Sequence, residues 1–340
     1  MGKKEWQRYD NREKALELVR AGRPLSAKEV ALVKSHYTGI GGLVRADWSG
    51  GAFFTPPPVV DFVHSLIGIR EAPGPTLEPS IGGGAFAEGI LPSLVTGIEP
   101  NRDSYRVCEL CYPGMTLHNA NVEEIFPSNG PSELDGKFDY CIGNPPFGLK
   151  IDWAGDIVGG RWRKVPSEWV FMEVAVRAVR PEGTIAFVVP DGMLSNSNAQ
   201  PVRDWLMERC YLKTVISLPT ETFFHAGTSV KCSVVYLTKY PLGMTKDKVV
   251  DYPILMSICE DVGWDSRGRA TNKCDLPMIL RTWQEFKHTG RVPDPAGVDP
   301  GEVDSQEAAR DISLPPSVQA SAAPSNDEDS LPYGQLTLFA

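Results

Sequence analysis

The residues best suited to chemistry form a short turn, Asn144-Pro145-Pro146-Phe147, directly after an apolar stretch at 138–142. Proline fixes φ and has no backbone N–H, so two prolines in succession end both a helix and a sheet ladder. The turn is therefore expected to hold an amide, two unpaired carbonyl oxygens and an aromatic ring in fixed relation. The Asn144 oxygen and the Pro145 carbonyl suit the two hydrogens of an amino group on a flat ring that stacks on Phe147. An ordinary Asn-Pro turn is the simpler alternative.

A second group of residues has the pattern of a nucleotide cradle. A strand at 76–78 ends in Glu78-Pro79, a glycine-rich turn follows, and an apolar stretch predicts a helix up to residue 94. Glycines let the backbone approach a ligand, and a helix start offers backbone N–H groups. Glu99 ends the next strand (94–98), where an acid is placed to bind ribose hydroxyls. An NAD-binding domain is the alternative, but Ala87 replaces its third glycine and the proline turn has no role there.

The order of these motifs resembles that of the S-adenosylmethionine-dependent N6-adenine DNA methyltransferases. They are FFTP at 53–56, EPxxGxGxF at 78–86, Glu99 and NPPF at 144–147. The stretch at 218–237 is similar to the modification subunits of type I restriction systems. The resemblance implies methyl transfer to adenine N6 in DNA, with the base flipped out of the duplex. A protein-glutamine or RNA methyltransferase with the same turn, and a non-catalytic DNA-associated protein, are the alternatives.

The resemblance also assigns roles to individual residues. The resemblance implies that Asn144, Pro145, Pro146 and Phe147 are the catalytic residues. It also implies that Phe147 and Phe224 stack on the target base, with Phe223 as the less favoured choice for the second ring and a core position as the alternative for Phe224. The residues expected to bind S-adenosylmethionine are Phe54, Thr55, Pro56, Glu78, Pro79, Gly82, Gly84, Phe86, Glu99 and Asn121. Asn121 stands where the family usually has an aspartate, and its side-chain oxygen keeps the ability to accept a hydrogen bond from the cofactor's adenine.

A polar segment at 149–166 follows the NPPF turn and is expected to be a long loop. Loops of this length inside a domain are usually functional or disordered. Cations around a tryptophan next to a base pocket suit phosphates and unpaired bases. The candidate DNA contacts are Lys150, Arg161, Trp162, Arg163 and Lys164. A solvated loop with one hydrophobic anchor explains the same residues.

Strands and helices alternate along the rest of the chain, which predicts an α/β fold with a doubly wound, Rossmann-like sheet. The strand at 230–238 follows its predecessor without a helical pattern, so it is expected to join as an antiparallel edge strand. Two short helices are expected at 10–22 and 26–36. The predicted regions are an N-terminal helical segment (1–50), the catalytic domain (51–240), a small extension (241–290) and a disordered acidic tail (291–340).

Composition gives a cytoplasmic, reduced protein as the expectation. The 340 residues carry a net charge of −9. Residues 301–340 contain seven acids and one arginine, and so account for −6 of this charge. The remaining, nearly neutral body is compatible with a basic cleft for DNA. The seven cysteines are scattered and odd in number, which favours thiols over disulfides, and Cys108 and Cys111 are expected to be packing residues rather than half of a metal site. No apolar stretch has membrane-spanning length.

The final residues, QLTLF, resemble the peptide by which bacterial DNA-processing proteins dock on the replication sliding clamp. The positions concerned are Gln335, Leu336, Leu338 and Phe339. Related DNA methyltransferases carry a large target-recognition domain after the region equivalent to residue 240. In this sequence, residue 240 is followed by the small extension (241–290) and the acidic tail (291–340). Sequence specificity is therefore expected to be relaxed, to come from 149–166, or to come from a separate specificity subunit.

Overall fold

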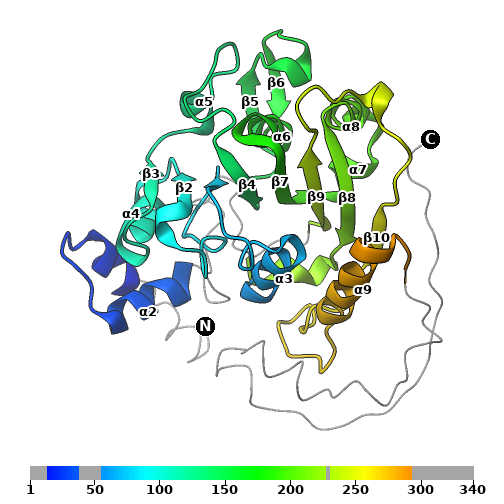
Figure 1. Cartoon of the computed structure of the whole chain (residues 1–340). Helices are drawn as coiled ribbons and strands as arrows, with labels where there is room; N and C mark the ends of the chain where they lie inside the picture. Colours follow the sequence, from blue (N-terminus) through cyan, green and yellow to red (C-terminus); the bar gives the residue numbers. More distant parts are fainter. Residues whose placement is uncertain (1–13, 38–54, 227–229, 293–340) are drawn as a thin grey trace.

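A central sheet of eight strands organises the computed structural model, which describes residues 14–37, 55–226 and 230–292. The strand order is β10-β8-β9-β7-β4-β1-β2-β3 (Figure 1). The strands of this sheet are β1 (Thr76–Glu78), β2 (Val95–Ile98), β3 (Thr116–His118), β4 (Phe138–Gly143), β7 (Val179–Pro190), β8 (Cys210–Ser217), β9 (Cys232–Lys239) and β10 (Leu255–Ile258). The chain builds outward from β1 in one direction and from β4 in the other, so the predicted doubly wound sheet is confirmed.

The strand β9 is antiparallel to both of its neighbours, whereas the other pairs in the sheet are parallel. Its antiparallel direction was predicted, but its position at the edge was not correct. It lies between β7 and β8, and β10 extends the sheet beyond β8. The physical reason is burial: four consecutive residues from Cys232 to Val235 are buried, so both faces of the strand are covered. Such a strand suits an interior position.

Helices cover both faces of the sheet. The helix α3 (Pro57–Ile67) and the helix α9 (Leu276–Thr289) share one hydrophobic cluster. The helices α5 (Val122–Ile125), α6 (Ser167–Ala178), α7 (Asp191–Ser195) and α8 (Gln200–Met207) contribute to a second cluster. A third, smaller cluster joins the helical residues 14–20 and α2 (Ala27–Tyr37) to α4 (Arg102–Cys111). Short 3₁₀ turns are η1 (Pro92–Leu94), η2 (Asp156–Val158), η3 (Ser197–Ala199), η4 (Thr220–Ala226) and η5 (Lys246–Lys248).

Helix boundaries follow local chemistry. Two prolines occupy the first turn of α3, where a missing N–H costs nothing, and Gly68 ends that helix with φ of 69°. Before α2, the Ser26 backbone N–H donates to Glu29 Oε2 at 2.8 Å, and the Glu29 N–H donates to Ser26 Oγ at 3.4 Å. This reciprocal pair is a capping box. The region from 241 to 290 joins the same body, because β10 extends the sheet and Trp283 Nε1 donates to the Leu66 carbonyl at 2.8 Å.

The helix expected after the glycine-rich turn does not form. The turn instead continues through successive hydrogen bonds between residues three apart, such as Ala87 N–H to the Gly84 carbonyl at 3.1 Å. Gly84 and Gly89 both have positive φ, at 85° and 80°. Residues in that conformation interrupt a right-handed helix, so the apolar side chains are buried by a series of turns.

The segment at 149–166 is not a loop but an antiparallel hairpin of β5 (Lys150–Trp153) and β6 (Arg163–Pro166). Its tip is fixed to α6 by the buried Glu173 carboxylate. This carboxylate accepts hydrogen bonds from Trp153 Nε1 at 2.7 Å, the Asp156 N–H at 2.7 Å and the Ile157 N–H at 3.2 Å. Trp153 is fully buried, whereas Trp162 is 65% exposed, so Trp153 and not Trp162 is the hydrophobic anchor of this segment.

The remaining expectations concern cysteines and membranes. Cys108 and Cys111 are buried on α4, and the described residues contain no cluster of metal-ligating side chains. Within the same residues, no helix has the length and apolarity needed to span a bilayer.

Candidate active site

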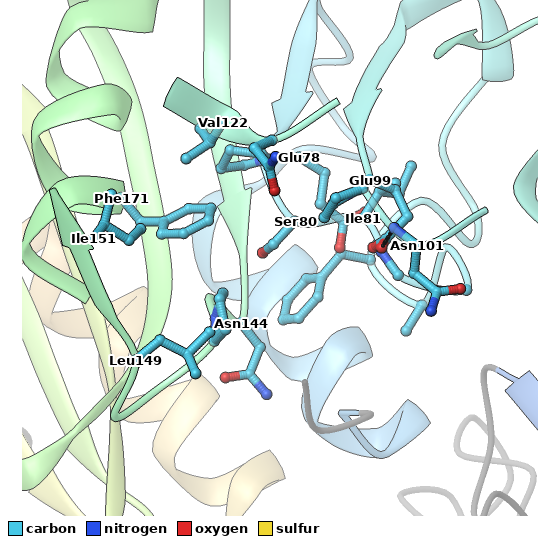
Figure 2. A pocket seen from close by; sticks show the side chains of 18 of the residues that line it. Glu78, Ser80, Ile81, Glu99, Asn101, Val122, Asn144, Leu149, Ile151 and Phe171 are labelled. Carbon is cyan, nitrogen blue, oxygen red and sulfur yellow. Dashed lines mark hydrogen bonds between the residues drawn. The ribbon is translucent and has the colours of Figure 1, made fainter. Parts of the chain in front are cut away.

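A cavity of about 490 Å³ lies at the carboxyl ends of β1, β2 and β4. In an open α/β sheet, ligands bind at this edge, where the strand order reverses. Here the reversal falls between the neighbouring strands β1 and β4. Figure 2 shows Ile81, Glu99 and Asn101 on one side of the cavity, and Leu149, Ile151 and Phe171 across from them.

The glycine-rich turn forms the cavity floor and is pressed against α4. A Cβ atom on Gly84 would lie 2.6 Å from Tyr112 Cε2 and 3.3 Å from Cys108 Sγ. Together with the positive φ, this crowding restricts the position to glycine. The Cys108 thiol also donates to the Gly82 carbonyl at 3.2 Å, which gives this cysteine a packing role below the turn.

The Glu99 carboxyl connects the turn to the end of β2. Its Oε2 accepts from the Gly82 N–H at 2.9 Å, and its Oε1 accepts from the Asn101 N–H at 2.7 Å. Burial raises the pKa of Glu99 to about 7, although both backbone hydrogen bonds act in the opposite direction. Near neutral pH this carboxyl therefore exists in both protonation states and can accept hydrogen bonds from a ligand's hydroxyl groups.

The Glu78 carboxyl lies in the same cavity and is only 2% exposed. Burial, and secondly the charge of Glu99, raises the pKa of Glu78 well above its usual range. Among the described residues, Glu78 Oε2 has no hydrogen-bond partner. A buried polar atom without a hydrogen-bond partner destabilises the folded protein. This oxygen is therefore suited to accept a hydrogen bond from a ligand.

The NPPF turn brings its asparagine into this cavity. Asn144 and Pro146 line it, Pro145 is buried beside them, and Phe147 is partly buried against the cluster that contains α3. Pro145 and Phe147 are not in the cavity lining itself. The expectation that both proline carbonyls are unpaired is wrong for Pro146, because Ser167 Oγ donates to its oxygen at 2.6 Å.

The FFTP motif reaches the turn through its threonine. Thr55 is 2% exposed, lines the cavity, and its Oγ1 accepts a hydrogen bond from Asn144 Nδ2 at 3.1 Å. Pro56 immediately precedes α3, whereas Phe54 lies outside the described residues. Two segments 89 positions apart are thus joined at one amide group.

Most of the expected cofactor residues are brought together, and some of the other expected residues are not. Glu78, Pro79, Gly82, Phe86, Glu99 and Asn121 all line the cavity, and Gly84 shapes the turn from below. Asn121 caps the N-terminus of α5, and its Nδ2 donates to Glu124 Oε1 at 2.6 Å. The side chain of Phe224 is outside the described part of the chain, and the neighbouring Phe223 is a core residue with 1% exposure.

The hairpin places its cations at two different distances from the cavity. Lys150 lines the cavity, whereas Arg161, Trp162, Arg163 and Lys164 are exposed toward the hairpin tip, with Trp162 65% exposed. Lys164 Nζ pairs with Asp152 at 3.2 Å.

The apolar wall of the cavity was not predicted from the sequence. It consists of Val122, Leu149, Ile151 and Phe171. The only available signals were that Val122 follows Asn121 and that Ile151 alternates with polar residues. Phe171 comes from α6, and nothing in the local sequence distinguishes it from a core residue.

Comparison with known proteins identifies the family. A sequence model described as N-6 DNA Methylase matches residues 44–291, which is well over half of the chain. The chain belongs to the N-6 DNA methylase family. The motif order that indicated such a methyltransferase is therefore confirmed at the level of the family.

Three known proteins are similar to this chain in sequence or in fold. "Defense against restriction protein B" of Escherichia phage P1 is 28% identical over 244 residues, covering 70% of this chain and 10% of the phage protein. The type II methyltransferase M.PaeR7I of Pseudomonas aeruginosa is 23% identical and is matched over 58% of this chain and 41% of its own length. The type I restriction-modification methyltransferase subunit of Streptococcus thermophilus has the same fold, with a TM-score of 0.53, 23% identity, and coverage of 69% and 53%. The chain therefore spans less than half the length of either curated relative.

Proposed function

We propose that this protein transfers the methyl group of S-adenosylmethionine to the N6 amino group of adenine in DNA. The observation that carries this proposal is that Thr55 and Asn144 line the same cavity as Glu78 and Glu99. Residues suited to a cofactor and residues suited to an amino group therefore share one space. Membership of the N-6 DNA methylase family supports adenine in DNA as the acceptor.

The residues of the cavity fit S-adenosylmethionine. A volume of about 490 Å³ lies within the usual range for ligand sites. Glu99 offers a carboxylate to ribose hydroxyls, and Glu78 Oε2 offers an acceptor to an ammonium group. Val122, Ile151 and Phe171 supply an apolar wall for a flat base. When bound, the cofactor supplies an electrophilic methyl group on a sulfonium.

The NPPF turn would activate the acceptor. The adenine N6 is a weak nucleophile because its lone pair is delocalised into the ring. Hydrogen bonds from N6 to Asn144 Oδ1 and to the Pro145 carbonyl would localise that lone pair on nitrogen. Since Asn144 Nδ2 donates to Thr55, the amide oxygen is the acceptor that this side chain presents to an amino group. The turn contributes positioning and electrostatics, and no covalent enzyme intermediate is required.

An adenine inside a duplex cannot reach a cavity at the rim of a sheet. We therefore infer that the target base leaves the stack and enters next to the NPPF turn. Phe147 would stack on the extruded base. The same role for Phe224 stays a prediction, because its side chain lies outside the described part of the chain.

The hairpin β5–β6 would hold the DNA near the cavity. The six consecutive residues 159–164 are exposed and carry three cations and one tryptophan, although the whole chain is acidic. Cations next to an exposed aromatic ring suit phosphates and an unpaired base.

We further propose that a separate subunit supplies the sequence specificity of this protein. Binding to the sliding clamp through Gln335, Leu336, Leu338 and Phe339 stays a prediction, because these residues lie outside the described part of the chain.

The test of this mechanism separates cofactor binding from methyl transfer. Asn144→Ala is expected to lower methyl transfer by at least about 100-fold, while the dissociation constant for S-adenosylmethionine changes little. Phe147→Ala should lose transfer in the same way through weaker base stacking. Asn129→Ala, at an exposed turn away from the cavity, is the matched control and should keep full activity. Wild-type rates of transfer in the Asn144→Ala protein would rule out the proposed role of the turn.

A further inference from the structure

The NPPF turn needs an anchor that its own backbone cannot provide. Pro145 and Pro146 have no N–H groups, so neither can donate a hydrogen bond to hold the turn in place. The proline rings fix φ at both positions, but they leave the following ψ angles unrestrained. The angle ψ of Pro146 sets the plane of the peptide that leads into Phe147, and therefore the direction in which Phe147 leaves the turn.

One residue from another element holds this peptide. Ser167, the first residue of α6, is fully buried. Its Oγ donates to the Pro146 carbonyl at 2.6 Å, and its backbone N–H donates to the Leu149 carbonyl at 3.0 Å. Both ends of the stretch between Pro146 and Leu149 are thus tied to the same residue.

The second neighbour of the hydroxyl does not compete for its hydrogen. Glu168 Oε2 lies 3.4 Å from Ser167 Oγ, which is beyond the usual range for an O–H···O bond. The distance of 2.6 Å to the Pro146 oxygen is within that range. The single hydroxyl hydrogen is therefore directed at the turn.

The position of Ser167 is itself well determined. It follows β6, whose last residue, Pro166, is paired with Lys150 across the hairpin. The hairpin is fixed to α6 by Glu173, so the hydroxyl is presented from a rigid frame. A rigid frame of this kind can hold a reacting geometry to within the tolerance that catalysis requires.

We propose that Ser167 is a positioning residue for the acceptor base, because its hydroxyl fixes the peptide between Pro146 and Phe147. The proposal rests on the methyltransferase function and adds to it a residue that none of the motifs contains. Ser167 touches the turn and not the cavity, so its loss should affect the acceptor side of the reaction and leave the cofactor side unchanged.

The test compares Ser167→Ala with Thr214→Val. Thr214 is an equally buried residue in β8, and its Oγ1 donates to the Leu255 carbonyl at 2.8 Å, in a part of the sheet away from the cavity. Ser167→Ala is expected to lower kcat about 10- to 100-fold while the dissociation constant for S-adenosylmethionine stays within about twofold. Hydrogen exchange of the peptide covering 143–149 should accelerate at the same time. Thr214→Val should change neither kcat nor this exchange.

A second variant and a second readout keep the outcome decisive. Ser167→Thr keeps the hydroxyl and is expected to keep the wild-type rate of exchange at 143–149. Equal exchange in the wild-type and Ser167→Ala proteins would overturn the proposal, as would fast exchange in Ser167→Thr. If the wild-type protein methylates no DNA, the proposed function fails, but the exchange comparison still decides whether Ser167 holds the turn.

Discussion

Hydroxyl and carboxyl groups set the chemistry of the cavity at the scale of single residues. Thr55 accepts a hydrogen bond from the amide of Asn144, and Ser167 donates one to the carbonyl of Pro146. Glu78 and Glu99 are both buried, and both have raised pKa values. In the proposed mechanism, the hydroxyl groups orient the acceptor side of the cavity, and the carboxyl groups bind the cofactor.

Removing the Thr55 hydroxyl should affect catalysis more than cofactor binding. In Thr55→Val the amide of Asn144 loses a hydrogen bond, whose net contribution is about 1 kcal/mol. We therefore expect kcat to fall about fivefold to tenfold. Thr55→Ser keeps the hydroxyl and serves as the matched control. Steady-state kinetics and calorimetric binding of S-adenosylmethionine measure the two effects separately. A weaker cofactor affinity with unchanged kcat would show instead that the threonine acts mainly on the cofactor.

Cofactor affinity should depend on pH through Glu99. Its pKa of about 7 means that the carboxyl is mostly protonated at pH 6 and mostly ionised at pH 8. If the ionised form binds the ribose hydroxyls, affinity for S-adenosylmethionine should rise about tenfold from pH 6 to pH 8. The dissociation constant measured across this range tests the claim. Glu99→Gln should bind more weakly and lose this part of the pH dependence, and an identical pH profile in both proteins would exclude Glu99 as its source.

Single residues were correctly expected at one shared cavity where a motif fixes both type and position, although their roles remain proposals. Glu78, Glu99 and Asn144 were identified because acids at strand ends and an amide before two prolines have few structural explanations. Ser167 and Phe171 were not identified, because a serine at a helix start and a phenylalanine in an apolar helix are common structural residues. Their proximity to the turn depends on the hairpin that precedes α6, which local sequence does not reveal.

At the scale of elements, the hairpin β5–β6 is the largest difference between expectation and structure. Its sequence was interpreted as a long loop because the segment 149–166 is polar and contains neighbouring glycines and cations. The hairpin is held in place by Glu173 of the following helix, α6, whose carboxylate accepts three hydrogen bonds from the hairpin. The position of β9 between β7 and β8 is a similar case, since strand order is a tertiary property.

The exposed hairpin cations should contribute to DNA affinity through phosphate contacts. Arg161→Gln combined with Arg163→Gln is expected to weaken binding of any DNA sequence and to reduce the slope of log K against log salt by about 2. The matched control is Lys246→Gln with Lys248→Gln. These exposed lysines lie in η5, in the connection between β9 and β10, and do not line the cavity. Fluorescence anisotropy at several salt concentrations gives the slope, and equal slopes in the two double variants would remove the hairpin from the DNA interface.

At the scale of the whole molecule, one sheet edge collects residues from distant parts of the sequence. Thr55 precedes α3, and Asn144 follows β4. Glu78 is the last residue of β1, and Glu99 directly follows β2. Figure 1 shows these elements around the central sheet. The regular alternation of strands and helices was sufficient to predict this edge and the doubly wound sheet. The net charge of −9 gave no such guidance, because most of it lies in residues 301–340.

The most direct test of the central claim is the destination of a labelled methyl group. Purified protein is incubated with radiolabelled S-adenosylmethionine and, in parallel, with DNA, RNA or protein, and the modified product is identified by mass spectrometry. The account predicts label in DNA as N6-methyladenine, and at least about 100-fold less label when Asn144→Ala replaces the wild type. Label in RNA or in protein, or no transfer to any of the three, would contradict it.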